Sequence, residues 1–145
     1  MTDSVLVVDA CVAAKWIFPG TSEPLAQQAD DLLRAYKLGR IELIVPDLFW
    51  TEIANFLWKG VRRRQISAGT AEDSLLAMTT HQLPTFCAQK VLAQALSIAM
   101  DFDRSIYDSI YVALAVAQRA SLITADERLA NALAAYFPVK WLGTF

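Results

Sequence analysis

Residues 5–9 read Val5-Leu6-Val7-Val8-Asp9, a short apolar run that ends in a carboxylate. A continuous run of aliphatic and β-branched residues is typical of a strand that is buried on both faces of a parallel sheet. In open parallel sheets, ligands bind beyond the carboxyl ends of the strands. We therefore expect Asp9 to lie at the edge of the sheet where a ligand is bound.

Strands and helices alternate along the rest of the chain. Further strands are predicted over residues 41–45, 83–86, 122–124 and 139–142. Helices are predicted over residues 10–17, 46–60, 69–80, 88–100, 105–120 and 126–135. Pro19-Gly20 would end the first of them. A further helix is predicted to begin after a cap at Thr21 or Ser22, with Pro24 in its first turn, and to end near Gly39. This alternation predicts an α/β/α sandwich with a mostly parallel central sheet, built as one domain of residues 1–145.

The composition excludes several classes of protein. With 55% hydrophobic and 19% charged residues in 145, the chain is not intrinsically disordered. It has no apolar run of about 20 residues that could span a membrane and no basic leader before its first apolar run. Because Cys11 and Cys87 make no disulfide or Cys-x-x-Cys pattern, we predict a protein of the reducing cytoplasm. Two separate cysteines and one histidine do not make a zinc site. The net charge of −2 disfavours a protein that coats nucleic acid but allows a nucleic-acid enzyme.

Four acidic residues are placed to meet at one edge of the predicted sheet. Asp9 follows the first strand, and Asp126 follows the strand over 122–124. Glu52 and Asp108 lie within one turn of the start of predicted helices, which brings them toward the same edge. Each acid also has an ordinary structural explanation, such as ending a strand for Asp9 or capping a helix for Asp126.

The remaining polar residues near these acids have similar alternatives. Ser105-x-x-Asp108 resembles a capping box, although Glu or Gln is usual at its last position. Glu52, Asn55 and Lys59 form one polar stripe at helical spacing, which a solvated helix face also explains. These local explanations do not account for the convergence of four acids on one edge.

Clustered carboxylates repel one another, so a cation must compensate them or at least one must be protonated. Oxygen ligands without histidine suit Mg²⁺ or Mn²⁺, which can activate a water molecule and neutralise charge on a phosphodiester. The chain lacks the glycine-rich phosphate and dinucleotide motifs and the Gly-x-Ser-x-Gly motif. The acids therefore indicate phosphoryl chemistry rather than acyl transfer.

Four stretches, in order, resemble the motifs of PIN-domain ribonucleases of the VapC toxin type. They are Val7-Val-Asp9-Ala-Cys-Val-Ala-Ala-Lys15-Trp16, Pro46-Asp-Leu-Phe-Trp-Thr-Glu52-Ile-Ala-Asn55-Phe-Leu, Ser105-Ile-Tyr107-Asp108-Ser-Ile-Tyr111-Val-Ala-Leu-Ala115 and Leu122-Ile-Thr124-Ala-Asp126-Glu-Arg-Leu129. The resemblance implies a PIN-like fold and a metal-dependent endoribonuclease that is the toxin of a toxin–antitoxin pair. It implies that Mg²⁺ or Mn²⁺ is bound by Asp9, Glu52, Asp108 and Asp126. It also implies that Ser105 supports the site and that Asn55 orients Glu52 or touches the substrate.

Basic and aromatic residues supply candidates for binding partners. Lys15, Lys59 and Arg62, the last in the run Arg62-Arg63-Arg64, are candidates for holding the RNA backbone. The resemblance implies a VapB-like antitoxin, which would place an Arg or Lys among the acids, and a homodimer. The aromatic residues Trp16, Phe18, Trp50 and Trp58 are expected mostly in the core, with an exposed groove for an amphipathic segment as the alternative.

Two other classes of protein remain as alternatives. One is a non-catalytic PIN-like module that binds RNA or protein, which four retained acids disfavour. The other is a phosphate-handling receiver or haloacid-dehalogenase-type phosphatase. The phosphatase needs Asp-x-Asp, but Cys11 occupies its second acidic position, and the receiver needs an acceptor after a central strand, where Asp47 instead opens a helix.

Overall fold

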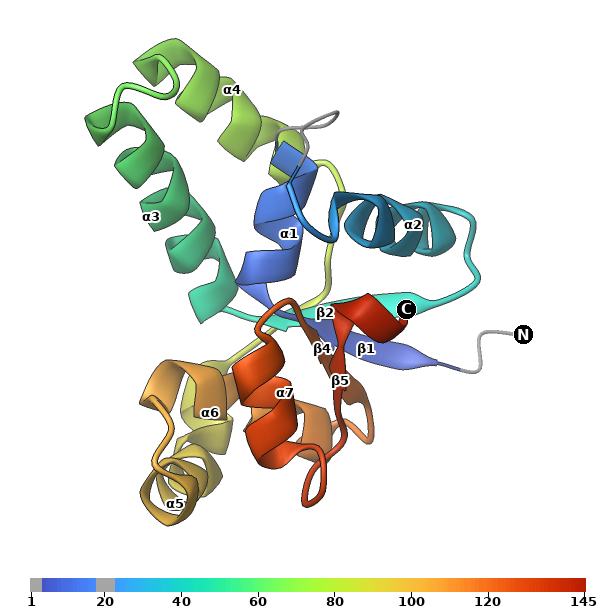
Figure 1. The fold of residues 1–145 in the computed structure, drawn as a ribbon. Helices are drawn as coiled ribbons and strands as arrows, with labels where there is room; N and C mark the ends of the chain where they lie inside the picture. Colours follow the sequence, from blue (N-terminus) through green and yellow to red (C-terminus); the bar gives the residue numbers. More distant parts are fainter. Residues whose placement is uncertain (1–3, 18–22) are drawn as a thin grey trace.

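The computed structural model describes residues 4–17 and 23–145. Five strands form one sheet in the order β3-β2-β1-β4-β5, and every neighbouring pair is parallel (Figure 1). The strands are β1 (Val5–Val8), β2 (Glu42–Pro46), β3 (Thr85–Phe86), β4 (Ser121–Thr124) and β5 (Val139–Trp141). The parallel sheet predicted from the sequence is confirmed, and β1 occupies its centre.

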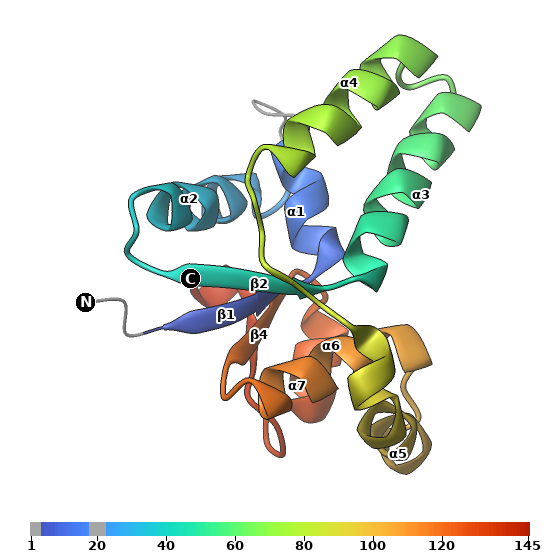
Figure 2. The ribbon, with the colours of Figure 1, turned by 180° about the vertical axis from the view of Figure 1, so that it is seen from behind.

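Helices cover both faces of the sheet. They are α1 (Ala10–Ile17), α2 (Ala26–Lys37), α3 (Leu48–Arg62), α4 (Ala68–Thr79), α5 (Leu92–Phe102), α6 (Ile106–Ala117) and α7 (Glu127–Leu133), with short 3₁₀ turns η1 (Ala88–Val91) and η2 (Leu142–Thr144). The helices α1 to α4 lie on one side and α5 to α7 on the other, which confirms the α/β/α sandwich (Figures 1 and 2). None of the helices in the described ranges combines the length and apolar character needed to cross a bilayer.

The apolar strands are continuous because both faces of the sheet are covered. Val7 and Val8 of β1 and Leu43 and Val45 of β2 are completely buried. The connection from β2 to β3 carries α3 and α4, which extend away from the sheet as an antiparallel pair (Figure 1). As a result α3 begins at the carboxyl edge of the sheet and presents its first turns there.

Two predicted helix starts differ from the structure. The helix α2 begins at Ala26, after Leu25 in a left-handed conformation (φ 66°), so Pro24 precedes the helix instead of lying in its first turn. The proposed stop at Pro19-Gly20 and caps at Thr21 or Ser22 lie outside the described residues. The helix predicted from Ala88 starts as the 3₁₀ turn η1, because the backbone of Val91 (φ −115°, ψ 6°) departs from α-helical geometry before α5.

Two aromatic residues that share the apolar spacing of their helices, which predicts that they are buried, are exposed. Phe56 is 37% exposed on α3, and Tyr107 is 60% exposed on α6. Phe56 follows the apolar spacing of its helix, but α3 leaves the sheet and is only partly covered there. Tyr107 lies in the first turn of α6, beyond the part of the helix that packs on the sheet.

The tryptophans divide between core and surface. Trp16 is buried and Trp50 is half-buried, with its indole N–H donating to Thr85 Oγ1 at 3.0 Å. Trp58 is 56% exposed, so the expectation that most of these aromatic residues are core holds for Trp16 and Trp50 and not for Trp58. Phe18 lies outside the described residues.

Candidate active site

Asp9 is held at the carboxyl end of β1. Its backbone N–H donates to the Ile123 carbonyl of β4 at 3.1 Å, and its own carbonyl accepts from Val12 N at 3.0 Å as α1 begins. Its side chain is buried, and the Thr124 hydroxyl donates to Asp9 Oδ2 at 2.9 Å. The position predicted from the apolar run is therefore confirmed, with the carboxylate fixed at the sheet edge.

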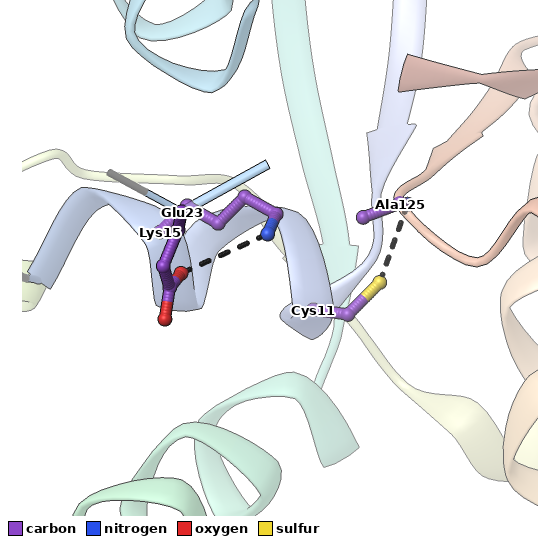
Figure 3. Close-up of polar contacts among 4 residues, drawn as sticks. All are labelled: Cys11, Lys15, Glu23 and Ala125. Carbon is purple, nitrogen blue, oxygen red and sulfur yellow. Dashed lines mark hydrogen bonds and ion pairs between the residues drawn. The ribbon is translucent and has the colours of Figure 1, made fainter. Parts of the chain in front are cut away.

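Thr124, the last residue of β4, links two acid-bearing segments. Its completely buried hydroxyl donates to Asp9 and accepts from the backbone N–H of Asp126 at 3.1 Å. The Cys11 sulfur lies 3.5 Å from the same hydroxyl. It also accepts a hydrogen bond from Ala125 N at 3.4 Å (Figure 3). The Thr124 contact was not predicted. The sequence signals were a hydroxyl residue at the end of an apolar strand and its place in the stretch Leu122-Ile-Thr124-Ala-Asp126.

Glu52 reaches the site from α3 and is half-buried. The Tyr111 hydroxyl, from α6, donates to Glu52 Oε1 at 2.7 Å. Tyr111 is only 1% exposed. Helical spacing with Ile110 and Leu114 predicts that Tyr111 lies on the packing face of its helix, and nothing local to the sequence indicates that its hydroxyl meets an acid on another helix.

Asp108 and Asp126 lie where α6 and α7 begin. Ser105 caps α6, because its hydroxyl accepts from Asp108 N at 3.0 Å. Asp126 caps α7, because its Oδ1 accepts from Leu129 N at 3.1 Å. Both predicted caps are confirmed. The cap at Asp126 uses one of two carboxylate oxygens, so capping and metal binding are compatible.

The four acids form one electrostatic group. Burial raises the pKa of Asp9 to about 6; the Thr124 hydrogen bond opposes this shift, and the charges of Asp108 and Glu52 add to it. Burial, together with the charge of Asp108, raises the pKa of Glu52. Burial also raises the pKa of Asp108, and the charge of Asp126 adds to it. Asp108 thus interacts electrostatically with each of the other three acids.

This donor set fits a hard cation. Within residues 4–17 and 23–145, no three His, Cys, Asp or Glu side chains stand close enough together to form a ready-made metal cage. Mg²⁺ does not need such a cage, because it keeps several of its waters and binds through a few carboxylates. A divalent cation would also relieve the repulsion that helps to raise the carboxyl pKa values. Loss of hydration, and then the charge of Asp9, raise the pKa of Cys11 to about 12, which disfavours a zinc thiolate.

A hollow beside Glu52 continues into a basic surface. It has a volume of about 230 Å³, lies between α1 and α3, and is lined by Ala10, Cys11, Ala14, Glu52, Asn55, Phe56 and Lys59. A second hollow of about 180 Å³ is lined by Lys59, Arg62 and Arg63. Lys59 borders both hollows, so together they form a path along α3 from Glu52 to Lys59 and Arg62, ending at Arg63 just after the helix.

Lys15 takes a different position from the other basic candidates. Its Nζ lies 3.8 Å from Glu23 Oε2 in an ion pair (Figure 3). It does not line either of the two hollows along α3. The structure therefore brings Asn55, Lys59 and Arg62 onto one path and leaves Lys15 beside it.

The four acidic residues lie at the carboxyl edge of a parallel sheet, where open α/β sheets bind their ligands. The PIN-domain family model matches residues 6–133, which include all four acids. Ribonuclease VapC3 of Pyrobaculum aerophilum is 34% identical over 128 residues, covering 87% of this chain and 92% of that protein. The chain belongs to the PIN-domain family, and this membership excludes the receiver and phosphatase alternatives.

Solved structures share the fold at low sequence identity. PAE2754 from Pyrobaculum aerophilum has a TM-score of 0.70 and 20% identity, with 97% of this chain and 85% of that chain covered. VapBC2 from Rickettsia felis, bound to a DNA fragment from its promoter, has a TM-score of 0.65 and 10% identity, with coverage of 94% and 98%. These similarities confirm the PIN-like sandwich predicted from the sequence.

Proposed function

We propose that this protein is an endoribonuclease that hydrolyses RNA phosphodiester bonds with Mg²⁺ or Mn²⁺, as the toxin of a VapBC-type toxin–antitoxin pair. The observation that carries the proposal is the placement of Asp9, Glu52, Asp108 and Asp126 at the carboxyl edge of the sheet. Hydrogen bonds with Thr124, Tyr111 and Ser105 fix this placement. Membership of the PIN-domain family and the likeness to a VapC ribonuclease support the reaction and the substrate class.

The acidic residues of the site have different proposed roles. Asp9, Asp108 and Asp126 would hold one or two cations, and Glu52 would bind a second cation or position the attacking water. When bound, the cation supplies neutralisation of the charge that develops on the phosphodiester and activation of a water molecule. Ser105 fixes the first turn of α6 and thereby the backbone of Asp108.

Asn55 is also part of the proposed site. It is exposed on α3, one turn beyond Glu52, and it lines the hollow that Glu52 also borders. From that position its amide is available to a ribose or phosphate oxygen of a substrate next to the acids. The family resemblance gives it this role or that of orienting Glu52.

Cleavage by the purified protein, freed of any partner, tests the proposed function. We expect a fluorescently labelled RNA to be cut when Mg²⁺ or Mn²⁺ is present, to remain intact in EDTA, and to be cut again after excess Mn²⁺ is restored. Equal cleavage in EDTA would contradict the metal-dependent mechanism. RNA binding without cleavage at any Mn²⁺ concentration would favour the non-catalytic module instead.

Lys59→Gln and Arg62→Gln are expected to weaken RNA binding several-fold each. Each substitution removes one cation from the path along α3, so the slope of log affinity against log salt should fall by about one. Arg62 also lies 5.9 Å from the ring of Trp58, so its position on the helix is already constrained. Electrophoretic or fluorescence-anisotropy titrations at several salt concentrations measure both quantities.

Lys140→Gln is the matched control, because Lys140 lines a separate hollow with Ser4 and Phe145. An equal loss of affinity in this control would mean that net charge, not the path along α3, determines binding. We expect Lys15→Gln to have a smaller effect than Lys59→Gln, since Lys15 is already paired with Glu23.

We also propose a VapB-like antitoxin as a partner and a homodimeric assembly. The likeness to the VapBC2 complex supports the antitoxin. An apolar hollow of about 260 Å³ between α3 and α4, bordered by the exposed Trp58, supplies surface of the kind that an amphipathic segment covers. An Arg or Lys of that segment placed among the four acids would neutralise them as the cation does.

A further inference from the structure

One buried hydroxyl connects the two helical layers at the carboxyl edge of the sheet. Tyr111 belongs to α6, on one side of the sheet, and Glu52 belongs to α3, on the other (Figures 1 and 2). The Tyr111 hydroxyl donates to Glu52 Oε1 at 2.7 Å, a short hydrogen bond of the charge-assisted kind. The bond therefore fixes the carboxylate of Glu52 from its buried side.

The Tyr111 side chain is rigidly placed, so it can hold the Glu52 carboxylate in one position. It is completely enclosed by the core, so its ring cannot turn out to solvent. A long, flexible Glu side chain loses considerable rotamer freedom when it is fixed, and a rigid buried donor supplies the opposing interaction. Because only Oε1 receives this bond, the bond sets the direction of the whole Glu52 carboxylate toward the hollow it lines.

Tyr111 also shares its helix with an acid of the site. Asp108 and Tyr111 are three residues apart, so they lie on the same face of α6. Ser105 fixes the start of this helix through the backbone of Asp108. A single helix thus carries one acid directly and positions a second acid from a different element.

We propose that Tyr111 is a positioning residue that orients Glu52 for cation binding and for catalysis. The inference rests on the proposed function, because it assigns Tyr111 a role in that same site. It differs from a packing role in one consequence: removing the hydroxyl while keeping the ring should impair the site without unfolding the protein.

Tyr111→Phe tests this inference, with Tyr107→Phe, at an exposed tyrosine in the first turn of the same helix, as the matched control. We expect Tyr111→Phe to lower the affinity for Mn²⁺ about tenfold, measured by calorimetry without RNA, as for other groups that orient metal ligands. We expect kcat to fall about tenfold with little change in KM for RNA. Tyr107→Phe should match the wild type, and circular dichroism should show both variants folded.

A double-mutant cycle with Glu52→Ala separates positioning from packing. If Tyr111 acts through Glu52, the double variant Tyr111→Phe/Glu52→Ala should bind Mn²⁺ no more weakly than Glu52→Ala alone. Multiplied losses in the double variant, or wild-type Mn²⁺ affinity and kcat in Tyr111→Phe, would overturn the inference. Should Tyr111→Phe fail to fold, Glu52→Asp withdraws the carboxylate from the hydroxyl and should lose a similar factor; wild-type affinity there would also overturn it.

Failure of the proposed function has a different signature. In that case the wild-type protein would bind no Mn²⁺ and cut no RNA, and Asp9→Asn would behave like the wild type. Loss of binding in Asp9→Asn combined with unchanged binding in Tyr111→Phe would overturn only the role of Tyr111.

Discussion

Asp9→Asn and Asp108→Asn are each expected to reduce metal-dependent RNA cleavage by about 10³-fold or more, with the fold retained. A bound cation contributes several kcal/mol of charge stabilisation to the transition state, and each 1.36 kcal/mol corresponds to a factor of ten in rate. The amide keeps the size of the carboxylate and still accepts the hydrogen bond that Thr124 donates to Asp9. Single-turnover cleavage with saturating Mn²⁺ measures the loss, and circular dichroism verifies folding.

Asp73→Asn is the control for this prediction. Asp73 is exposed on α4, in the pair of helices that extends away from the sheet, and the substitution makes the same change of charge. We expect cleavage at the wild-type rate. Undiminished cleavage by folded Asp9→Asn or Asp108→Asn would remove the acids from the mechanism.

The metal-free protein is expected to be more stable at pH 5 than at pH 7.5. The pKa of Asp9 is raised from 3.8 to about 6 in the folded state, so the folded protein holds this proton more tightly than the unfolded chain. The resulting stabilisation is complete below about pH 4 and is lost as the pH rises through about 6. The raised pKa values of Glu52 and Asp108 act in the same direction.

The size of this effect follows from the shift at Asp9. A change from 3.8 to about 6, at 1.36 kcal/mol per pKa unit, corresponds to about 3 kcal/mol between the protonated and ionised forms. Asp9→Asn in the metal-free protein should therefore raise the free energy of unfolding at pH 7.5 by up to about 3 kcal/mol and flatten its pH dependence between pH 5 and 7.5. Urea unfolding in EDTA at several pH values measures both. Wild-type stability that rises with pH over this range, or an Asp9→Asn variant less stable than the wild type at pH 7.5, would contradict the assignment.

Local sequence patterns predicted the site residues whose positions are set by the strand or helix that carries them. The apolar run before Asp9 gave both the strand and the position of its carboxylate at the sheet edge. The caps at Ser105 and Asp126 were predictable because capping depends on residues three positions apart. The parallel sheet followed from the alternation of strands and helices.

The contacts that orient the acids were not predictable in the same way. Tyr111 and Glu52 are separated by 59 residues, and Thr124 and Asp9 by 115. A tyrosine that fills the core and a tyrosine that donates to an acid follow the same helical period, so periodicity cannot distinguish them. Only the packing of α6 against the sheet places the Tyr111 hydroxyl beside α3.

The exposure of aromatic residues was also not predictable from the sequence. Phe56 and Tyr107 follow apolar spacing, but whether such a face is covered depends on elements distant in the sequence. On α3, the face that carries Phe56 borders the hollow beside Glu52 instead of the core. The departure from the predicted burial thus occurs next to the acidic site.

A calorimetric titration of the metal-free protein with Mn²⁺ at pH 7.5, without RNA or partner, tests most directly whether the four acids form one cation site. The account predicts saturable binding by the wild type, loss of that binding in Asp9→Asn and in Asp108→Asn, and wild-type binding in Asp73→Asn. Absence of binding at millimolar Mn²⁺, or binding that survives in Asp9→Asn and Asp108→Asn, would contradict it.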